Sequence, residues 1–332
     1  MIHPDAPPSL VFADSQGNIV DFPDIDMAGT SNTVFLAPDL SELIPLPEGS
    51  EIFTLPGRLP IGWDRSANEA VLLDTDPYGT GKAVQAVAAF MAPAHTAILT
   101  AAYHSSPDAP TLPLFAYTAG QFWVAGFRSD NDCRQDSTRF DYALIEMRTR
   151  KKLQTHRQNR LIQHLGKCCL TYGCPAARNY FMGRWEAPLP SSPACNARCL
   201  GCISKQPSGC CPSTQDRIQF IPTPAEIAEI GIPHLEEADN PITSFGQGCE
   251  GEPLLQADIL VSAVQKIRSA TRRGTINLNS NASRPQQVKR LIKAGLDSIR
   301  VSLNSAQECY YNSYYRTENY QFTDVKHSIQ AM

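Results

Sequence analysis

The sequence predicts an α/β fold for residues 185–332, preceded by a mixed α+β region over residues 1–145. Strand-like and helix-like segments alternate from about residue 185, which is typical of parallel βαβ units. Before that point, short apolar runs are separated by proline and glycine, and 14 of the 26 prolines precede residue 115. A basic, cysteine-containing connector over residues 146–184 joins the two regions.

The second region carries strand and helix signals in turn. Thr223-Pro224-Ala225-Glu226 is a capping box with proline at the first helical position, and it predicts a helix to about residue 238. A second helix is expected over residues 255–270, and a third follows Pro285 and ends at Gly295. The expected strands lie between these helices, at residues 186–190, 242–245, 275–279 and 298–303.

The first region predicts short strands and one helix. Apolar runs that suggest strands lie at residues 34–36, 71–73, 97–99 and 122–124. The alanine-rich segment between Lys82 and Met91 predicts a buried helix, with a break near Pro93. We predict no function for this region.

Charge patterning places one candidate polyanion contact in the connector. The net charge of -4 gives no global basic field that would attract nucleic acid. Six cations nevertheless gather in the connector, and they could contact RNA or form a solvated helix face; they are Arg148, Arg150, Lys151, Lys152, Arg157 and Arg160. Because no aromatic residues interleave with them to stack on bases, the solvated face is favoured.

The chain start and the apolar stretches bear on location. Residues 1–5 show no positive segment followed by an apolar core, so we expect no secretory signal. The most apolar stretch, residues 83–102, contains Gln85, Pro93 and His95 and never reaches about 20 clean apolar residues. We therefore expect a cytoplasmic protein without a membrane span. In that compartment, eleven cysteines indicate metal or cluster ligation before disulfides.

Cys195, Cys199 and Cys202 form the most informative motif. Their spacing of four and then three residues lets one short loop place three thiolates around one face of a cubane cluster. Electron-transfer clusters generally use four ligands, so three leave one iron open to bind a small molecule. The alternative is a structural zinc site, which needs a closed set of four ligands and could take Cys210 or Cys211 as the fourth.

This triplet resembles the cluster motif of the radical S-adenosylmethionine (SAM) superfamily, and the likeness extends over residues 185–332. The segment Gly248-Cys249-Glu250-Gly251-Glu252-Pro253 resembles the superfamily's glycine-glutamate-proline motif, which holds the amino group of the methionine moiety. Asn279 and Asn281 lie in a segment that resembles the next strand, and Ser302 and Asn304 in one that resembles the fourth. The resemblance implies SAM contacts from these residues; the full expected set is Gly248, Glu250, Gly251, Glu252, Pro253, Asn279, Asn281, Ser302 and Asn304.

The resemblance implies the fold and the chemistry. The fold would be a partial (β/α)6 TIM-like barrel, with its site at the carboxyl ends of the strands. With only four expected strands, we expect that barrel to be truncated at its C-terminal side. The chain would be an enzyme in which a 4Fe–4S cluster cleaves SAM to a 5′-deoxyadenosyl radical, which abstracts hydrogen from substrate. An electron donor such as a flavodoxin or ferredoxin is implied. The substrate is not identified, with RNA, a peptide and a partner enzyme all considered.

Two alternatives stay open beside this interpretation. The chain could be a non-catalytic iron–sulfur or zinc-binding scaffold, or an electron-transfer protein.

Many superfamily members place an aromatic residue where Gly201 stands, so the adenine contact would fall to Leu200 or Ile203.

Five further cysteines are either a second metal site or buried free thiols: Cys168, Cys169, Cys174, Cys210 and Cys211. We interpret Cys249 as a small residue near the cofactor, and His156 and His164 as solvent-exposed or packing residues.

Overall fold

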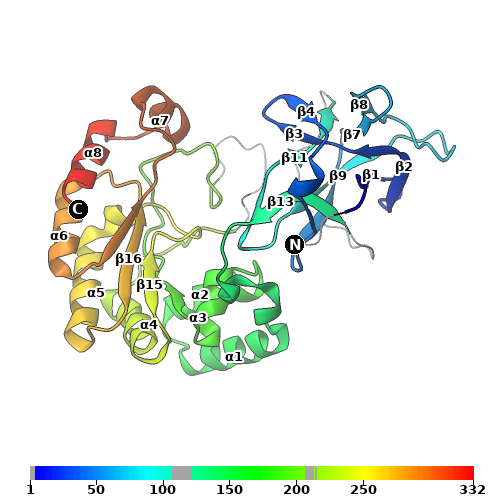
Figure 1. Cartoon of the computed structure of the whole chain (residues 1–332). Coiled ribbons are helices and arrows are strands. Elements are labelled where there is room, and N and C mark those ends of the chain that lie inside the picture. Colours follow the sequence, from blue (N-terminus) through cyan, green and yellow to red (C-terminus); the bar gives the residue numbers. More distant parts are fainter. Residues whose placement is uncertain (1–3, 107–121, 206–212, 214) are drawn as a thin grey trace. The chain divides into compact units, whose positions relative to one another are not determined.

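The computed structural model describes residues 4–106, 122–205, 213 and 215–332 (Figure 1). The chain divides into two compact units, Met1–Asp141 and Tyr142–Met332. The range expected to form a connector, residues 146–184, belongs to the second unit, and most of it lies in three helices between residues 142 and 182.

The first unit is built from antiparallel strands. Its largest sheet has seven strands in the order β12-β7-β2-β1-β9-β6, with β8 also paired to β7. Two three-stranded sheets have the orders β10-β13-β5 and β11-β3-β4. The strands are β1 (Ser9–Ala13), β2 (Ile19–Met27), β3 (Gly29–Ser31), β4 (Val34–Leu36), β5 (Leu43–Pro45), β6 (Glu51–Leu55), β7 (Arg58–Asp64), β8 (Glu69–Leu72), β9 (Gln85–Phe90), β10 (His95–Ala97), β11 (Thr100–Ala101), β12 (Tyr103–Ser105) and β13 (Trp123–Arg128).

The mixed α+β prediction for the first region is wrong, and so is the helix expected between Lys82 and Met91. Within the described part of this unit, the only helical turns are short 3-10 turns, and residues 85–90 form strand β9. β9 pairs with β1 on one side and with β6 on the other. Pairing along both edges outweighs the helix propensity of its alanines, because propensity is a weak preference that tertiary contacts override.

The second unit contains a four-stranded parallel sheet, which confirms the predicted α/β fold. Its strands are β14 (Glu186–Pro188), β15 (Ile242–Phe245), β16 (Thr275–Ser280) and β17 (Ser298–Val301), and they pair in chain order. Three helices precede the sheet: α1 (Tyr142–Thr155), α2 (Arg160–Leu170) and α3 (Pro175–Met182).

Three helices connect the strands and pack side by side: α4 (Pro224–Glu237), α5 (Ala257–Ala270) and α6 (Pro285–Ala294) (Figure 1). The capping box at Thr223 begins α4, and Gly295, at a φ of 109°, ends α6. The helices α7 (Glu308–Tyr315) and α8 (Phe322–Gln330) follow β17. Because every strand runs in the same direction, the loops that follow them gather at one edge of the sheet.

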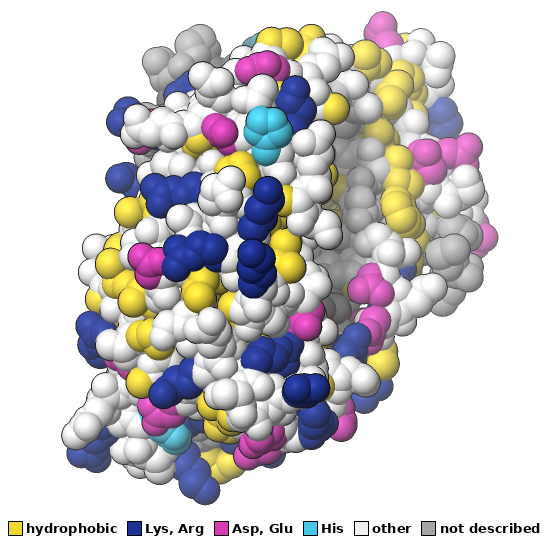
Figure 2. Space-filling model, turned by 90° about the vertical axis from the view of Figure 1, so that its left-hand side faces the viewer, with side chains coloured by type: hydrophobic (Ala, Val, Ile, Leu, Met, Phe, Trp, Pro, Cys, Tyr) yellow, Lys and Arg dark blue, Asp and Glu magenta, His cyan; other side chains and the backbone are white. Residues whose placement is uncertain are grey.

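The outer face of α5 and α6 is basic. Figure 2 shows Lys and Arg side chains gathered over this helical face, where Lys266, Lys289, Arg290 and Lys293 are exposed. The opposite sides of the same helices are apolar and buried, with Leu260, Val264, Ile267, Val288 and Leu291 all fully covered. The cations therefore keep the outside of an amphipathic layer in solvent.

Most of the connector cations have partners inside the second unit. Arg148 donates to the Met182 carbonyl at 2.9 Å, and Arg150 pairs with Glu146 at 2.7 Å. The Lys152 ammonium lies 4.1 Å from the centre of the Tyr180 ring, and burial lowers its pKa. These contacts support a structural role for the basic segment, because cations held in this way are not free for a polyanion.

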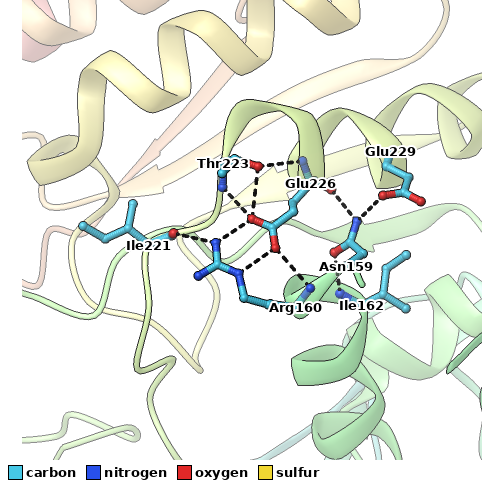
Figure 3. A network of polar contacts seen from close by, with 7 residues as sticks. All are labelled: Asn159, Arg160, Ile162, Ile221, Thr223, Glu226 and Glu229. Carbon is cyan, nitrogen blue, oxygen red and sulfur yellow. Dashed lines mark hydrogen bonds and ion pairs between the residues drawn. The ribbon is translucent and has the colours of Figure 1, made fainter. Parts of the chain in front are cut away.

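Arg160 joins the start of α2 to the start of α4 (Figure 3). Its Nε and Nη2 donate to the two carboxylate oxygens of Glu226 at 2.8 and 2.7 Å, and Nη2 also donates to the Ile221 carbonyl. This arginine lowers the pKa of Glu226 to about 2. Beside it, Asn159 caps α2 by accepting from the Ile162 amide and donates to Glu229.

Among the described residues, no helix combines the length and the apolar character needed to cross a membrane.

Candidate functional site

The candidate site lies at the carboxyl edge of the parallel sheet, where four loops meet. The loop after β14 carries the cysteine triplet, and the loop after β15 carries Glu250 and Glu252. Asn281 follows β16, and Ser302 follows β17. The expected cofactor residues therefore come together at the edge where barrel enzymes bind their ligands.

The triplet loop is anchored to the segment that follows β17. The amide of Arg198 donates to the Tyr315 carbonyl at 2.9 Å, and the amide of Leu200 donates to the Tyr314 carbonyl at 3.1 Å. The Glu318 amide returns a bond to the Asn196 carbonyl at 2.8 Å, and Arg198 forms an ion pair with Glu318. Together with an isolated antiparallel β-bridge between Ala197 and Thr317, these contacts give the short loop a defined shape.

The three thiols of the triplet are half-buried and interact electrostatically. Burial and the neighbouring Cys195 and Cys202 raise the pKa of Cys199 to about 12. Burial opposes the shift at Cys202, but hydrogen bonds from Ser204 and the charge of Arg217 lower the pKa of that thiol. The Arg217 Nη2 lies 3.5 Å from the Cys202 sulfur. An arginine at this place would stabilise an anionic metal–thiolate centre.

The spacing of the triplet fits a cluster better than a single ion. Among the described residues, one group of three His, Cys, Asp or Glu side chains has all its ligand atoms within 4.8 Å of one another, and it consists of His164, Cys168 and Cys249. The triplet is therefore more open than that limit. A tetrahedral zinc ion needs sulfurs about 4 Å apart, whereas a cubane distributes three thiolates over three irons and needs wider spacing.

Glu250 is buried and holds its own loop in shape. One carboxylate oxygen accepts from the amides of Gly246 and Gln247 at 2.6 and 3.0 Å. The other accepts from the Ser191 amide and hydroxyl and from the Ser192 amide, at 2.7 to 3.0 Å. Burial raises the pKa of Glu250 to about 7, and these five donors oppose that shift by favouring the ionised form. Glu250 therefore fastens the loop after β15 to the end of β14.

Glu252 makes the equivalent link to β16. Its carboxylate accepts from the Ser280 hydroxyl at 2.6 Å and from the Asn281 amide at 2.9 Å. The Asn281 side chain then donates to Asn196, inside the triplet loop, at 2.8 Å. Both glutamates, expected as cofactor contacts, are thus engaged with the protein itself and position the loops around the site.

Gly251 permits the closest approach between the two main loops. Its amide donates to the Ser192 carbonyl at 2.7 Å, and a Cβ at this position would lie 2.0 Å from the Ala194 carbonyl oxygen. Only glycine fits at position 251, because the neighbouring Ala194, which directly precedes Cys195 in the chain, leaves no room for a side chain. Gly246 has a φ of 78°, and a Cβ on it would meet the Asn279 carbonyl oxygen at 1.8 Å. The glycines of the motif therefore serve loop packing.

The remaining expected contacts are placed as follows. Gly248 lies against Ile203 and Gln215, and Pro253 is buried at the start of a 3-10 turn. The Asn279 amide group donates to the Phe245 carbonyl at 3.2 Å. Ser302 and Asn304 are exposed in the segment after β17, so their side chains are accessible at the site edge.

Of the other cysteines, Cys168, Cys169 and Cys174 lie close enough to interact electrostatically, but their sulfur atoms do not form one compact ligand group. Cys168 is buried in the group with His164 and Cys249, while the thiol of Cys169, next along α2, lies 3.4 Å from the Thr149 hydroxyl. Cys174 precedes α3 and donates its amide to the Cys168 carbonyl at 3.0 Å. Cys210 and Cys211 lie outside the described residues.

Gly201 has an aromatic neighbour that comes from elsewhere in the chain. A Cβ on Gly201 would lie 2.7 Å from the Tyr314 hydroxyl, so Tyr314 of α7 borders the position where an aromatic side chain was expected. Leu200 and Ile203, the expected substitutes, are 45% and 50% exposed. The tyrosine-rich run of residues 310–315 was the signal in the sequence, but its register gave no reason to select Tyr314.

Sequence reasoning also missed Arg217 and His164. Arg217 reaches Cys202 across a segment that the motif does not cover, and nothing in the local sequence indicates that contact. His164 precedes Cys168 by one helical turn, and this spacing was a usable signal for a shared face of α2.

Comparison with known proteins finds one family model and several solved structures that are similar to part of the chain. Residues 189–330 match the family model of the Radical SAM superfamily. The chain is similar to the solved FeFe-hydrogenase maturase HydG from Carboxydothermus hydrogenoformans, with 14% identity and a TM-score of 0.34 over 57% of this chain and 51% of that chain. A second HydG maturase structure gives 14% identity and a TM-score of 0.32, over 57% and 48% of the two chains. The chain therefore spans about half the length of these solved structures. No curated protein matches it.

Proposed function

We propose, since residues 189–330 belong to the Radical SAM superfamily, that this chain is an enzyme whose 4Fe–4S cluster is held by Cys195, Cys199 and Cys202. The observation that carries the proposal is the triplet itself. Three mutually interacting thiols lie at the carboxyl edge of a parallel sheet, and their sulfur atoms do not all lie within 4.8 Å of one another. Superfamily membership supports radical SAM chemistry in general and leaves the substrate open.

The chemistry that the cluster supplies when bound is reductive cleavage of SAM to methionine and a 5′-deoxyadenosyl radical, which abstracts hydrogen from a substrate. The chain's own residues would position both groups. Three thiolates would leave one iron for the amino and carboxylate groups of SAM. Arg217 would stabilise the anionic centre from the side of Cys202.

The loop of residues 246–252 would bind the methionine amino group through its main-chain carbonyls. Both glutamate carboxylates of this loop already accept hydrogen bonds from the protein, and so do the carbonyls of Gln247, Cys249, Glu250 and Glu252, so the glycine carbonyls of the loop are the better candidates. Glu250 and Glu252 would act as positioning residues. Gly248, Gly251, Pro253 and Asn279 would shape the loop, while Asn281, Ser302 and Asn304 would supply polar contacts around the cofactor.

The wider assembly is proposed on the same basis. The four parallel strands with their helices are compatible with part of a (β/α)6 barrel. Cluster reduction would need an electron donor such as a flavodoxin or ferredoxin. The paired connector cations do not favour RNA over a peptide as substrate.

Anaerobic reconstitution of the full chain tests the proposal. With dithionite and SAM, we expect iron at the level of one 4Fe–4S cluster per chain and formation of 5′-deoxyadenosine. Serine at 195, 199 and 202 should abolish both, whereas serine at the exposed Cys133 and Cys309 should abolish neither. Iron binding without SAM cleavage would instead support an electron-transfer protein or scaffold, and zinc at the triplet without iron would support a structural metal site.

A further inference from the structure

A second sulfur-containing group lies outside the triplet. His164 and Cys168 lie one turn apart on α2, and Cys249 lies in the loop after β15. One ligand atom from each of the three lies within 4.8 Å of the other two. The group thus combines two segments that are far apart in the sequence.

We propose that His164, Cys168 and Cys249 bind one Zn²⁺ ion. The Cys168 sulfur lies 3.6 Å from the His164 Nε2. In a tetrahedral zinc site with bonds of about 2.3 Å to sulfur and 2.0–2.1 Å to nitrogen, a sulfur and a nitrogen ligand lie about 3.5 Å apart. The spacing is therefore that of ligands sharing one ion.

The surroundings of the group suit a zinc–thiolate site. Cys168 is fully buried, and Cys249 is 3% exposed. Two thiolates balance the charge of Zn²⁺, and a neutral imidazole adds a third donor. Nitrogen and sulfur donors select zinc over magnesium or calcium, which prefer oxygen ligands.

An ion at this place would brace the candidate active site. It would link α2 to the loop of residues 246–252, because the ligand Cys249 lies in that loop and directly precedes Glu250. The same loop packs against the triplet loop through Gly251. With three protein ligands, this tetrahedral site would take a water molecule as its fourth ligand, and it is independent of the cluster because its protein ligands are different residues.

Metal analysis of the full chain tests the proposal. Protein purified without oxygen from zinc-supplemented cells should contain about one zinc per chain. Zinc should persist when Cys195, Cys199 and Cys202 are changed to serine and iron is lost. Cys168→Ser and Cys249→Ser should each lower zinc by roughly 10-fold or more, because each removes a direct ligand. Cys169→Ser is the matched control on the same helix and should retain zinc, since its thiol faces Thr149.

Cobalt provides a spectroscopic test. Metal-free protein with serine at 195, 199 and 202, titrated with Co²⁺, should develop a thiolate-to-cobalt charge-transfer band and the visible bands of tetrahedral coordination, because the triplet then offers the ion no thiolate. Overturning results are zinc absent from the wild type, iron in its place, zinc unchanged in Cys168→Ser and Cys249→Ser, or octahedral cobalt spectra. A Cys168–Cys249 disulfide in the anaerobic protein, seen by peptide mass spectrometry, would equally overturn the proposal.

Discussion

The second unit contains two sulfur-rich groups that differ in how their ligand atoms are spaced. In the His164–Cys168–Cys249 group, three ligand atoms lie within 4.8 Å of one another, and two of the residues are buried. In the Cys195–Cys199–Cys202 triplet, the thiols are half-buried and more widely spread. The first spacing suits a single ion and the second a cubane. Ligand type alone would not distinguish them.

One loop connects the two groups. Residues 246–252 carry Cys249 on one side and pack through Gly251 against the triplet loop on the other. Glu250, between them, ties the same loop to the end of β14. Changes in this loop are therefore expected to affect both sites, whereas changes in ligands outside the loop should affect one site each.

Replacing Cys195, Cys199 and Cys202 by serine is the sharpest way to separate the groups. We expect cluster iron to fall at least ~10-fold, because all three direct ligands are lost. Zinc should remain near its wild-type level. Parallel iron and zinc analysis of one sample measures both, and loss of the two metals together would contradict the separation.

Glu250→Gln should disturb both sites through the shared loop. The carboxylate accepts five hydrogen bonds. In the glutamine variant, the NH₂ group replaces one of the two oxygens and cannot accept, so the donors that face it lose their hydrogen bonds. We expect a loss of about 2–3 kcal/mol in the free energy of unfolding. Denaturant unfolding measures this loss. Glu146→Gln removes an exposed ion pair with Arg150 and should cost no more than about 0.5 kcal/mol; equal effects would refute the role given to Glu250.

Gly251→Ala should affect the triplet more than the zinc group. Its Cβ would lie 2.0 Å from the Ala194 carbonyl oxygen, so the triplet loop must move. We expect about 2 kcal/mol of destabilisation and lower iron loading. Gly201→Ala is the control, since its Cβ meets only the end of the Tyr314 side chain and should cost less than about 0.5 kcal/mol. Normal iron loading in Gly251→Ala would contradict the close contact.

Arg160→Gln should have the smallest effect. It removes the Arg160–Glu226 link between α2 and α4 and leaves the proposed zinc ligands of α2 in place. The guanidinium lowers the pKa of Glu226 from 4.5 to about 2, so this pair stabilises the fold above pH 4.5 and the stabilisation is lost as pH falls towards 2. We expect only a small loss of stability at neutral pH, because Arg160 is half exposed. Thermal melts should then show a weaker decline between pH 4.5 and 2 than the wild type. An unchanged acid profile would refute this role.

The second unit was largely readable from the sequence because its signals are local. The capping box at Thr223, the glycine at 295 and the alternating segments marked four strands and their helices. In the first unit, the segment of residues 85–90 was misassigned because its alanines favour a helix, and only pairing with β1 and β6 makes it a strand.

The two sulfur groups differed in the same way. The triplet is a short motif that can be recognised along the chain. The His164–Cys168–Cys249 group depends on a fold that brings α2 to the loop after β15, and only its His–Cys half has a local spacing. The internal use of Glu250 and Glu252 also escaped the motif, because a sequence pattern does not show which donors surround a carboxylate.

The claim that one cluster iron stays open to SAM is tested most directly by electron paramagnetic resonance of the reduced, reconstituted full chain. Adding SAM should change the cluster signal, because its amino and carboxylate groups would bind the iron that lacks a thiolate. The variant with serine at 195, 199 and 202 should show no cluster signal, either with or without SAM. A wild-type signal that is identical with and without SAM would contradict the account.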